Sequence, residues 1–230
     1  MLKKNGYPDD RIILIMEDDI AYNNKNTEQG VVKTDPHGEN LYTNPEIDYK
    51  VSELTPSDVM DIMEGNENDK LNKVIKSTSN DNILVFWSGH GTQNELVWGD
   101  LFMGVRKDMI KNSLYNMGVK RNYRKMLFLT EACYSGSIMN ENDIPGALFI
   151  TAANENETSK ADNYNSTLGV WMSNKFTYGI REQLNEDMYV SIREMYYKIF
   201  INTVGSHVMV YNTENFGNIY QNSIAEFFLY

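Results

Sequence analysis

Cysteine is almost absent from this chain, which contains a single one among 230 residues. One thiol cannot form an intrachain disulfide, and it cannot build a cysteine-based zinc site. Long apolar runs are also missing, because no stretch reaches the roughly 18 residues that a membrane span requires. Residues 1–6 lack the apolar core of a signal peptide, so any such peptide is expected to lie outside this chain.

Basic residues are too few to balance the acidic ones. The chain has 21 Lys and Arg against 32 Asp and Glu, which gives a formal net charge of −11. Such an excess argues against a surface that tracks nucleic-acid phosphates, so no nucleic-acid partner is expected. It is typical of solubility and also suits a protein that works at acidic pH. Without a repeat or a clear linker, residues 1–230 are predicted to form a single domain.

Short apolar runs are present, and four of them are nearly continuous rather than alternating. Strands buried on both faces of a parallel sheet have this pattern. The runs are residues 12–16, 83–87, 126–130 and 147–151, and a further strand is predicted at 206–211. Helices are predicted at residues 55–64, 106–115, 171–184 and 191–204. This alternation predicts a three-layer α/β fold, with helices on both faces of a mostly parallel sheet, and the polar stretch 23–52 is expected to be a long surface excursion.

Two of the predicted strands end in a turn of small residues with one reactive side chain. The strand at 83–87 leads into Ser-Gly-His-Gly, with His90, and the strand at 126–130 leads into Glu-Ala-Cys-Tyr-Ser-Gly, with Cys133. Ligands bind at the carboxyl ends of strands in open parallel sheets, so both side chains are expected to face one cleft if the two strands are neighbours. An imidazole beside a thiol favours the thiolate and later protonates a leaving amine, as a cysteine peptidase requires. The N–H groups of Gly91 and Cys133 are candidates for an oxyanion hole.

Each candidate also has a plainer interpretation. A lone cysteine is more often a small buried hydrophobe than a nucleophile. His90 has the alternative of a polar turn residue, His207 is expected to be structural within a strand, and His37 is given no role. The acidic residues 17–19 follow a predicted strand and are expected to cap a turn rather than bind a metal. No metal or other cofactor is therefore predicted.

Several segments together carry a family resemblance. The most specific is Glu-Ala-Cys-Tyr-Ser-Gly-Ser at residues 131–137, and Gly-His-Gly at 89–91 and Thr-Ala-Ala-Asn at 151–154 accompany it. On these residues the chain resembles the legumain (asparaginyl endopeptidase) family of caspase-fold cysteine peptidases, over most of its length. The catalytic subunit of the GPI transamidase is a more distant resemblance, with a similar fold and the same His-Gly and Cys positions.

The resemblance implies hydrolysis of peptide bonds in peptides or proteins, classically after Asn. Cys133 would form a thioester with His90 as its partner, and attack by an amine on that thioester would give transpeptidase or ligase activity. Glu131, Thr158 and Ser159 would line the pocket for the residue before the cleaved bond. The resemblance also implies protein inhibitors as further partners, and a lysosomal, vacuolar or secreted location.

The chain departs from the family pattern at several points. The family's amino-terminal strand, with an active-site Asn and a pocket Arg, is apparently missing, and so is a carboxyl-terminal prodomain. Val170 stands where legumains commonly have a pocket Asp, and an apolar side chain cannot accept a hydrogen bond from an Asn amide. Gly89 stands where many legumains have Asp and transamidase subunits have Gly. A GPI-anchor transamidase subunit, or a catalytically inactive, truncated relative that acts as a binding module, therefore stays an alternative to an endopeptidase.

Overall fold

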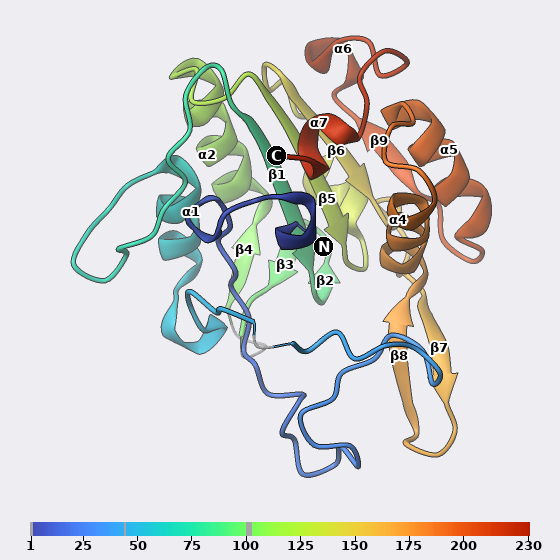
Figure 1. Ribbon diagram of the computed structural model, residues 1–230. Coiled ribbons are helices and arrows are strands. Elements are labelled where there is room, and N and C mark those ends of the chain that lie inside the picture. The colour runs from blue at the N-terminus through green and yellow to red at the C-terminus, as the bar shows by residue number, and fades with distance from the viewer. Residues whose placement is uncertain (1, 44, 100–102) are drawn as a thin grey trace.

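The computed structural model describes residues 2–43, 45–99 and 103–230 of the chain. A four-stranded sheet lies at its centre, with the strand order β1-β5-β6-β9 (Figure 1). Three of these strands are parallel, and the last is antiparallel to its neighbour. The strands are β1 (Asn82–Ser88), β5 (Lys125–Glu131), β6 (Ala147–Thr151) and β9 (Met209–Tyr211). Strands predicted at 83–87, 126–130 and 147–151 are confirmed, whereas the run at 206–211 is a strand only over its last three residues.

Helices cover both faces of this sheet (Figure 1). They are α1 (Pro56–Glu64) and α2 (Lys107–Val119) on one face, and α4 (Lys175–Glu186) and α5 (Ile192–Asn202) on the other. Successive side chains of β5 pack against the two helical layers in turn, because a strand directs them to opposite faces of the sheet. Met126 and Phe128 join the core beneath α1 and α2, while Leu127 and Leu129 join the core beneath α4 and α5. The predicted three-layer α/β fold with a mostly parallel sheet is thus confirmed.

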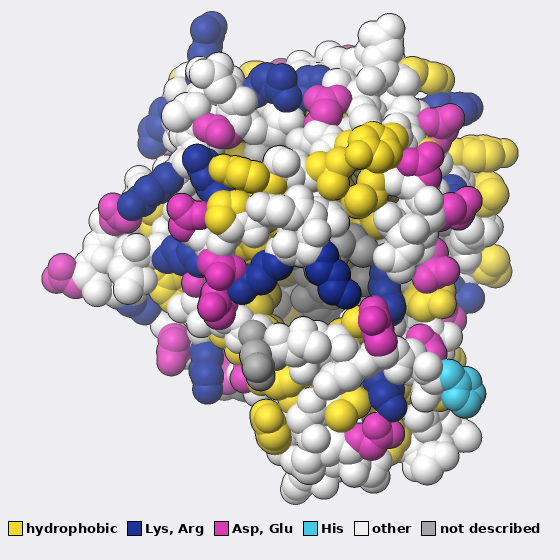
Figure 2. All heavy atoms as spheres, in the orientation of Figure 1, with side chains coloured by type: hydrophobic (Ala, Val, Ile, Leu, Met, Phe, Trp, Pro, Cys, Tyr) yellow, Lys and Arg dark blue, Asp and Glu magenta, His cyan; other side chains and the backbone are white. Residues whose placement is uncertain are grey.

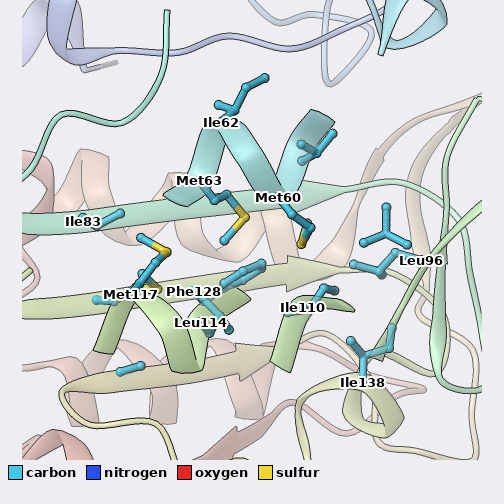
Figure 3. Packing of buried hydrophobic residues seen from close by; sticks show 14 of the residues in the cluster. Met60, Ile62, Met63, Ile83, Leu96, Ile110, Leu114, Met117, Phe128 and Ile138 are labelled. Atoms are coloured by element: carbon cyan, nitrogen blue, oxygen red, sulfur yellow. The ribbon is translucent and has the colours of Figure 1, made fainter. Parts of the chain in front are cut away.

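The core beneath α1 and α2 is built largely from methionine and aliphatic side chains (Figure 3). Met60 and Met63 of α1 and Met117 of α2 pack together over Phe128 of the sheet. Flexible methionines fill irregular gaps between helices and a strand.

The ends of α1 follow from its sequence. The Thr55 hydroxyl accepts a hydrogen bond from the N–H of Asp58 at 3.2 Å, and the Asp58 carboxylate accepts one from the N–H of Thr55 at 2.7 Å. This reciprocal pair satisfies backbone donors that the first turn of a helix leaves free. Gly65 ends the helix with φ of 80°, a left-handed conformation that suits glycine. The helix predicted at residues 55–64 is therefore confirmed.

Residues 12–16 do not form the strand predicted for them. Their only bridge pairs Ile15 with Tyr49, and the N–H of Leu14 donates to the carboxylate of Asp48 at 2.8 Å. The run is apolar because Ile13 and Ile15 pack against the core, not because it lies inside the sheet. Among the described residues, no strand pairs with the outer edge of β1, where a groove of about 1850 Å³ runs up to His90.

Short strands escaped the sequence prediction. Residues 171–174, predicted as the start of a helix, belong to β8 (Val170–Asn174), which pairs with β7 (Ala161–Asn165) in a hairpin. A second small sheet contains β2 (Gly91–Thr92), β3 (Glu95–Val97) and β4 (Gly104–Arg106), so α2 begins only after β4. Strands of two to five partly exposed residues show no apolar run that a sequence pattern can detect.

Other short elements complete the chain. They are the 3-10 helices η1 (Lys3–Asn5), η2 (Asp9–Arg11) and η3 (Val51–Glu53), and the α-helices α3 (Ser135–Met139), α6 (Thr213–Phe216) and α7 (Ala225–Phe228). The described residues of the range 23–50 contain no helix or strand. Residue 44 lies outside the described residues. The surface excursion predicted at 23–52 is therefore confirmed over nearly all of its length.

The molecular surface carries charges of both signs. On the face shown in Figure 2, Lys and Arg side chains are interspersed with Asp and Glu side chains rather than gathered in one field. Among the helices of the described ranges, none has both the length and the apolar character of a membrane span.

Candidate active site

His90 and Cys133 follow neighbouring parallel strands. In the pairing of β1 with β5, Ser88 stands opposite Glu131, so the two strands end at the same level. The N–H of Gly89 donates to the carbonyl of Glu131 at 3.0 Å, which ties the His90 turn to the end of β5. The structure thus brings the two turns together at the carboxyl edge of the sheet.

Gly91 marks the closest approach of the two turns. A Cβ atom at this position would stand 2.3 Å from the carbonyl oxygen of Cys133. A second link lies further along, where the N–H of Asn94 donates to the Ser137 hydroxyl at 2.8 Å. Only glycine permits this backbone approach, because any side chain would displace a neighbouring main chain.

Cys133 sits in a sharp strand-to-helix turn. The next residue, Tyr134, has φ of 55°, in the left-handed region that few residues other than glycine adopt. Its N–H is held by the carbonyl of Glu157 at 2.8 Å. The thiol is free and half-buried, with its Sγ 3.9 Å from the Ser159 hydroxyl, and His90 is exposed. A strained turn that presents a partly accessible nucleophile is a common feature of active sites.

Two backbone N–H groups are available beside the thiol. The carbonyl of His90 accepts from the N–H of Val97 in β3 at 3.0 Å. Because a trans peptide directs its N–H opposite to its carbonyl, the N–H of Gly91 points away from β3. Within the described ranges, the N–H of Cys133 has no hydrogen-bond acceptor. Both N–H groups therefore remain candidates for the predicted oxyanion hole.

Glu131 is a buried carboxyl group, 1% exposed, at the end of β5. One oxygen accepts hydrogen bonds from the N–H and the hydroxyl of Thr177, both at 3.1 Å, and the other has no partner among the described residues. Burial raises the pKa of Glu131, and the two hydrogen bonds from Thr177 offset part of that rise. The group can therefore accept a hydrogen bond and, once protonated, also donate one.

Ser159 links this carboxyl to the thiol, since it contacts both Glu131 and Cys133. Thr158 is exposed, and its hydroxyl accepts from the Lys160 ammonium at 3.1 Å. Val170 is 48% exposed and is the first residue of β8. It therefore belongs to the hairpin and takes no part in the contact between Cys133 and Ser159.

Sequence reasoning missed three residues near this site. Thr177 of α4 binds Glu131, and the side chain of Glu157 pairs with His207 at 2.9 Å. His207 was predicted to lie in a strand, but it precedes β9 and its side chain is 66% exposed. No local signal could have found these residues, because their partners lie 46 and 50 positions away in the chain.

Comparison with known proteins identifies the family. Residues 1–227 match the Peptidase C13 family, and the chain belongs to it. Legumain from Rattus norvegicus is 33% identical over 224 residues, covering 94% of this chain and 51% of that protein. A vacuolar-processing enzyme from Citrus sinensis is 30% identical over 238 residues, covering 92% and 46%. The predicted legumain resemblance is confirmed, and the chain spans about half the length of these curated relatives.

A solved structure of a Geobacter sulfurreducens protein has a similar fold. The two overlay with a TM-score of 0.52 at 13% sequence identity, covering 80% of this chain and 83% of the other. At this identity the likeness supports the shared architecture alone.

Proposed function

We propose that this chain is a single-domain cysteine endopeptidase in which Cys133 is the nucleophile and His90 its acid–base partner. The contact between the two strand-end turns carries this proposal. It places a half-buried thiol, an imidazole-bearing loop and two free N–H groups at one edge of the sheet. Membership of the Peptidase C13 family supports the same chemistry.

The reaction proceeds through a thioester. His90 takes the thiol proton, and the sulfur attacks the substrate carbonyl carbon to form a C–S bond. The resulting oxyanion is bound by the N–H groups of Gly91 and Cys133. When the C–N bond breaks, His90 gives its proton to the leaving amine. Water then attacks the thioester, which releases a carboxylic acid and restores the thiol; an amine in place of water gives ligation.

Glu131, Thr158 and Ser159 line the pocket for the residue before the cleaved bond. An amide side chain both donates and accepts hydrogen bonds, and the raised pKa of Glu131 suits such a ligand. Val170 supplies no acceptor from the hairpin, so Asn is accepted without being strictly required. Peptides or proteins are the substrates, protein inhibitors are further partners, and the acidic lysosome, vacuole or extracellular space is the place of action.

The test uses Cys133→Ala and His90→Ala, with His37→Ala as the matched control because His37 is exposed in the excursion. A peptide library is digested over a pH series, and kcat/KM is measured on the best substrate. Losing the nucleophile abolishes cleavage, and losing His90 lowers kcat/KM by about 100-fold or more. His37→Ala keeps the wild-type value. Cleavage that survives in Cys133→Ala, or His90→Ala kinetics equal to the control, would reject the proposal.

A further inference from the structure

Glu157 joins three backbone segments near the nucleophile. It belongs to the pocket loop, residues 154–159, which runs between β6 and β7. One carboxylate oxygen accepts from the N–H of Asn154 at 3.0 Å and from the N–H of His207 at 2.6 Å. The other pairs with Nδ1 of the His207 ring at 2.9 Å. The side chain thus closes the pocket loop on itself and ties it to the chain that enters β9.

The same loop holds the nucleophile turn. The carbonyl of Glu157 accepts from the N–H of Tyr134, the residue that follows Cys133, at 2.8 Å. Two residues further on, the Ser159 hydroxyl lies 3.9 Å from the Cys133 sulfur. A shift of the pocket loop therefore moves both the turn that carries the thiol and a wall of the pocket.

The contact between Glu157 and His207 is expected to persist in acid. Partial burial raises the pKa of Glu157, but hydrogen bonds from Asn154 and His207 outweigh this and hold the pKa below its usual range. A carboxyl whose folded pKa is lowered contributes stability that is lost only as the pH falls through that lowered value. A carboxylate accepts a hydrogen bond from a charged imidazole and also from a neutral one whose proton is on Nδ1, so the contact at 2.9 Å does not depend on one charge state of the ring.

Other titratable groups face the pair without replacing its contacts. Glu155 accepts from the Tyr211 hydroxyl at 3.4 Å, and Lys160 binds Thr158 and packs against Gly205. Tyr211 has its pKa raised by burial first, and by Glu155 and Glu157 in addition, so it stays neutral over the acid range.

We propose that Glu157 and His207 are positioning residues that lock the pocket loop against the nucleophile turn and keep the site assembled in acid. In this arrangement the Glu157 carboxylate is the fixed acceptor for two backbone N–H groups and for the His207 ring. The effect on catalysis rests on the proposed peptidase function, whereas the lock itself does not.

Glu157→Gln is the diagnostic variant. The amide oxygen of this variant still accepts hydrogen bonds from the two backbone N–H groups, and its NH2 group donates to a neutral ring nitrogen. In a charged ring both nitrogens carry a proton, so the NH2 group and the ring nitrogen would face each other as two donors. We expect kcat/KM within about threefold of wild type near pH 8 and about tenfold or more below it near pH 5, because only a positively charged ring meets the amide with a second donor. Adding His207→Asn removes the ring and restores the acid value to within about threefold, because an Asn amide takes up no proton. Glu155→Gln, which removes a carboxylate from the same loop, keeps the wild-type pH profile.

The rate at which iodoacetamide alkylates Cys133 gives a readout that needs no peptidase activity. It is measured over the same pH series, with the unfolding temperature of each variant at each pH. We expect the alkylation rate of Glu157→Gln to depart from wild type only in acid, and the double variant to follow wild type. An equal loss at both pH values, no loss at all, or no recovery in the double variant would overturn the lock. If wild type cleaves no peptide while alkylation behaves as expected, the peptidase proposal fails and the lock stands.

Discussion

At the scale of single residues, Gly91 and Gly89 form a natural pair for testing the site. A Cβ on Gly91 would stand 2.3 Å from the Cys133 carbonyl, whereas one on Gly89 would meet nothing within 4 Å. Both glycines flank His90, and neither has a positive φ that would by itself exclude alanine. Substitution of Gly91 disturbs the contact between the two turns, whereas substitution of Gly89 changes only the backbone flexibility of the His90 turn. Comparing the two variants therefore distinguishes these effects.

Gly91→Ala is expected to lower kcat/KM by about 100-fold, because a displacement of about 1 Å near reacting groups has costs of this order. Gly89→Ala should stay within about threefold of wild type. Steady-state kinetics together with thermal unfolding of both variants make the comparison. Equal kinetics for the two variants would mean that the approach of the turns does not matter for the reaction.

At the scale of elements, the long excursion is docked on the β7–β8 hairpin and α4 by polar contacts (Figure 1). The Asn163 side chain donates to the carbonyl of Thr34 at 2.9 Å, and Arg181 of α4 binds the Thr34 hydroxyl and lies 3.6 Å from the Glu39 carboxylate. A few polar contacts contribute little net free energy, so the excursion is expected to open locally without unfolding the core.

Arg181→Ala should therefore speed proteolytic nicking within residues 23–43, by about fivefold if about 1 kcal/mol of docking is lost. Arg193→Ala is the matched control, because Arg193 stacks on Tyr197 and Tyr220 away from the excursion. Limited proteolysis followed by mass spectrometry locates the cuts. Similar nicking rates in the two variants would show that Arg181 does not hold the excursion.

At the scale of the whole molecule, the central sheet has one long edge strand, β1 with 7 residues, and one short edge strand, β9 with 3 residues. Among the described residues no strand pairs with the outer edge of β1, and Phe86 in that strand is 45% exposed. Unpaired edge strands template association with other chains unless charge opposes it. The net charge of −11 supplies that repulsion at neutral pH and vanishes near the isoelectric point of about 4.8.

We expect the protein to self-associate as the pH falls from about 7 toward its isoelectric point, and Phe86→Lys to reduce this association by about twofold or more in weight-average mass. Phe200→Lys adds the same charge at a side chain that is 41% exposed and belongs to helix α5 rather than to a strand. Sedimentation velocity at each pH measures the mass. If Phe200→Lys suppresses association equally, net charge and not the open edge governs it.

Much of this architecture was predictable because its signals are local. Continuous apolar runs mark the buried strands β1, β5 and β6, and the Thr55 cap and Gly65 mark the two ends of α1. The small-residue turns with His90 and Cys133 stand directly after such strands, so the order of the chain alone assigns both to one sheet edge. The run at 12–16 shows the limit of this reasoning, because an apolar sequence reports burial and not the identity of the pairing partner.

The sequence by itself determined which segments are buried, where α1 starts and stops, and which two reactive side chains stand directly after buried strands. Only the tertiary structure decided that Gly91 touches the Cys133 carbonyl, that Thr177 binds Glu131, and that the Glu157 carboxylate reaches His207. The physical reason is distance along the chain. Periodicity and capping act over a few residues, whereas these contacts join residues more than 40 positions apart, which only the packing of the layers brings together.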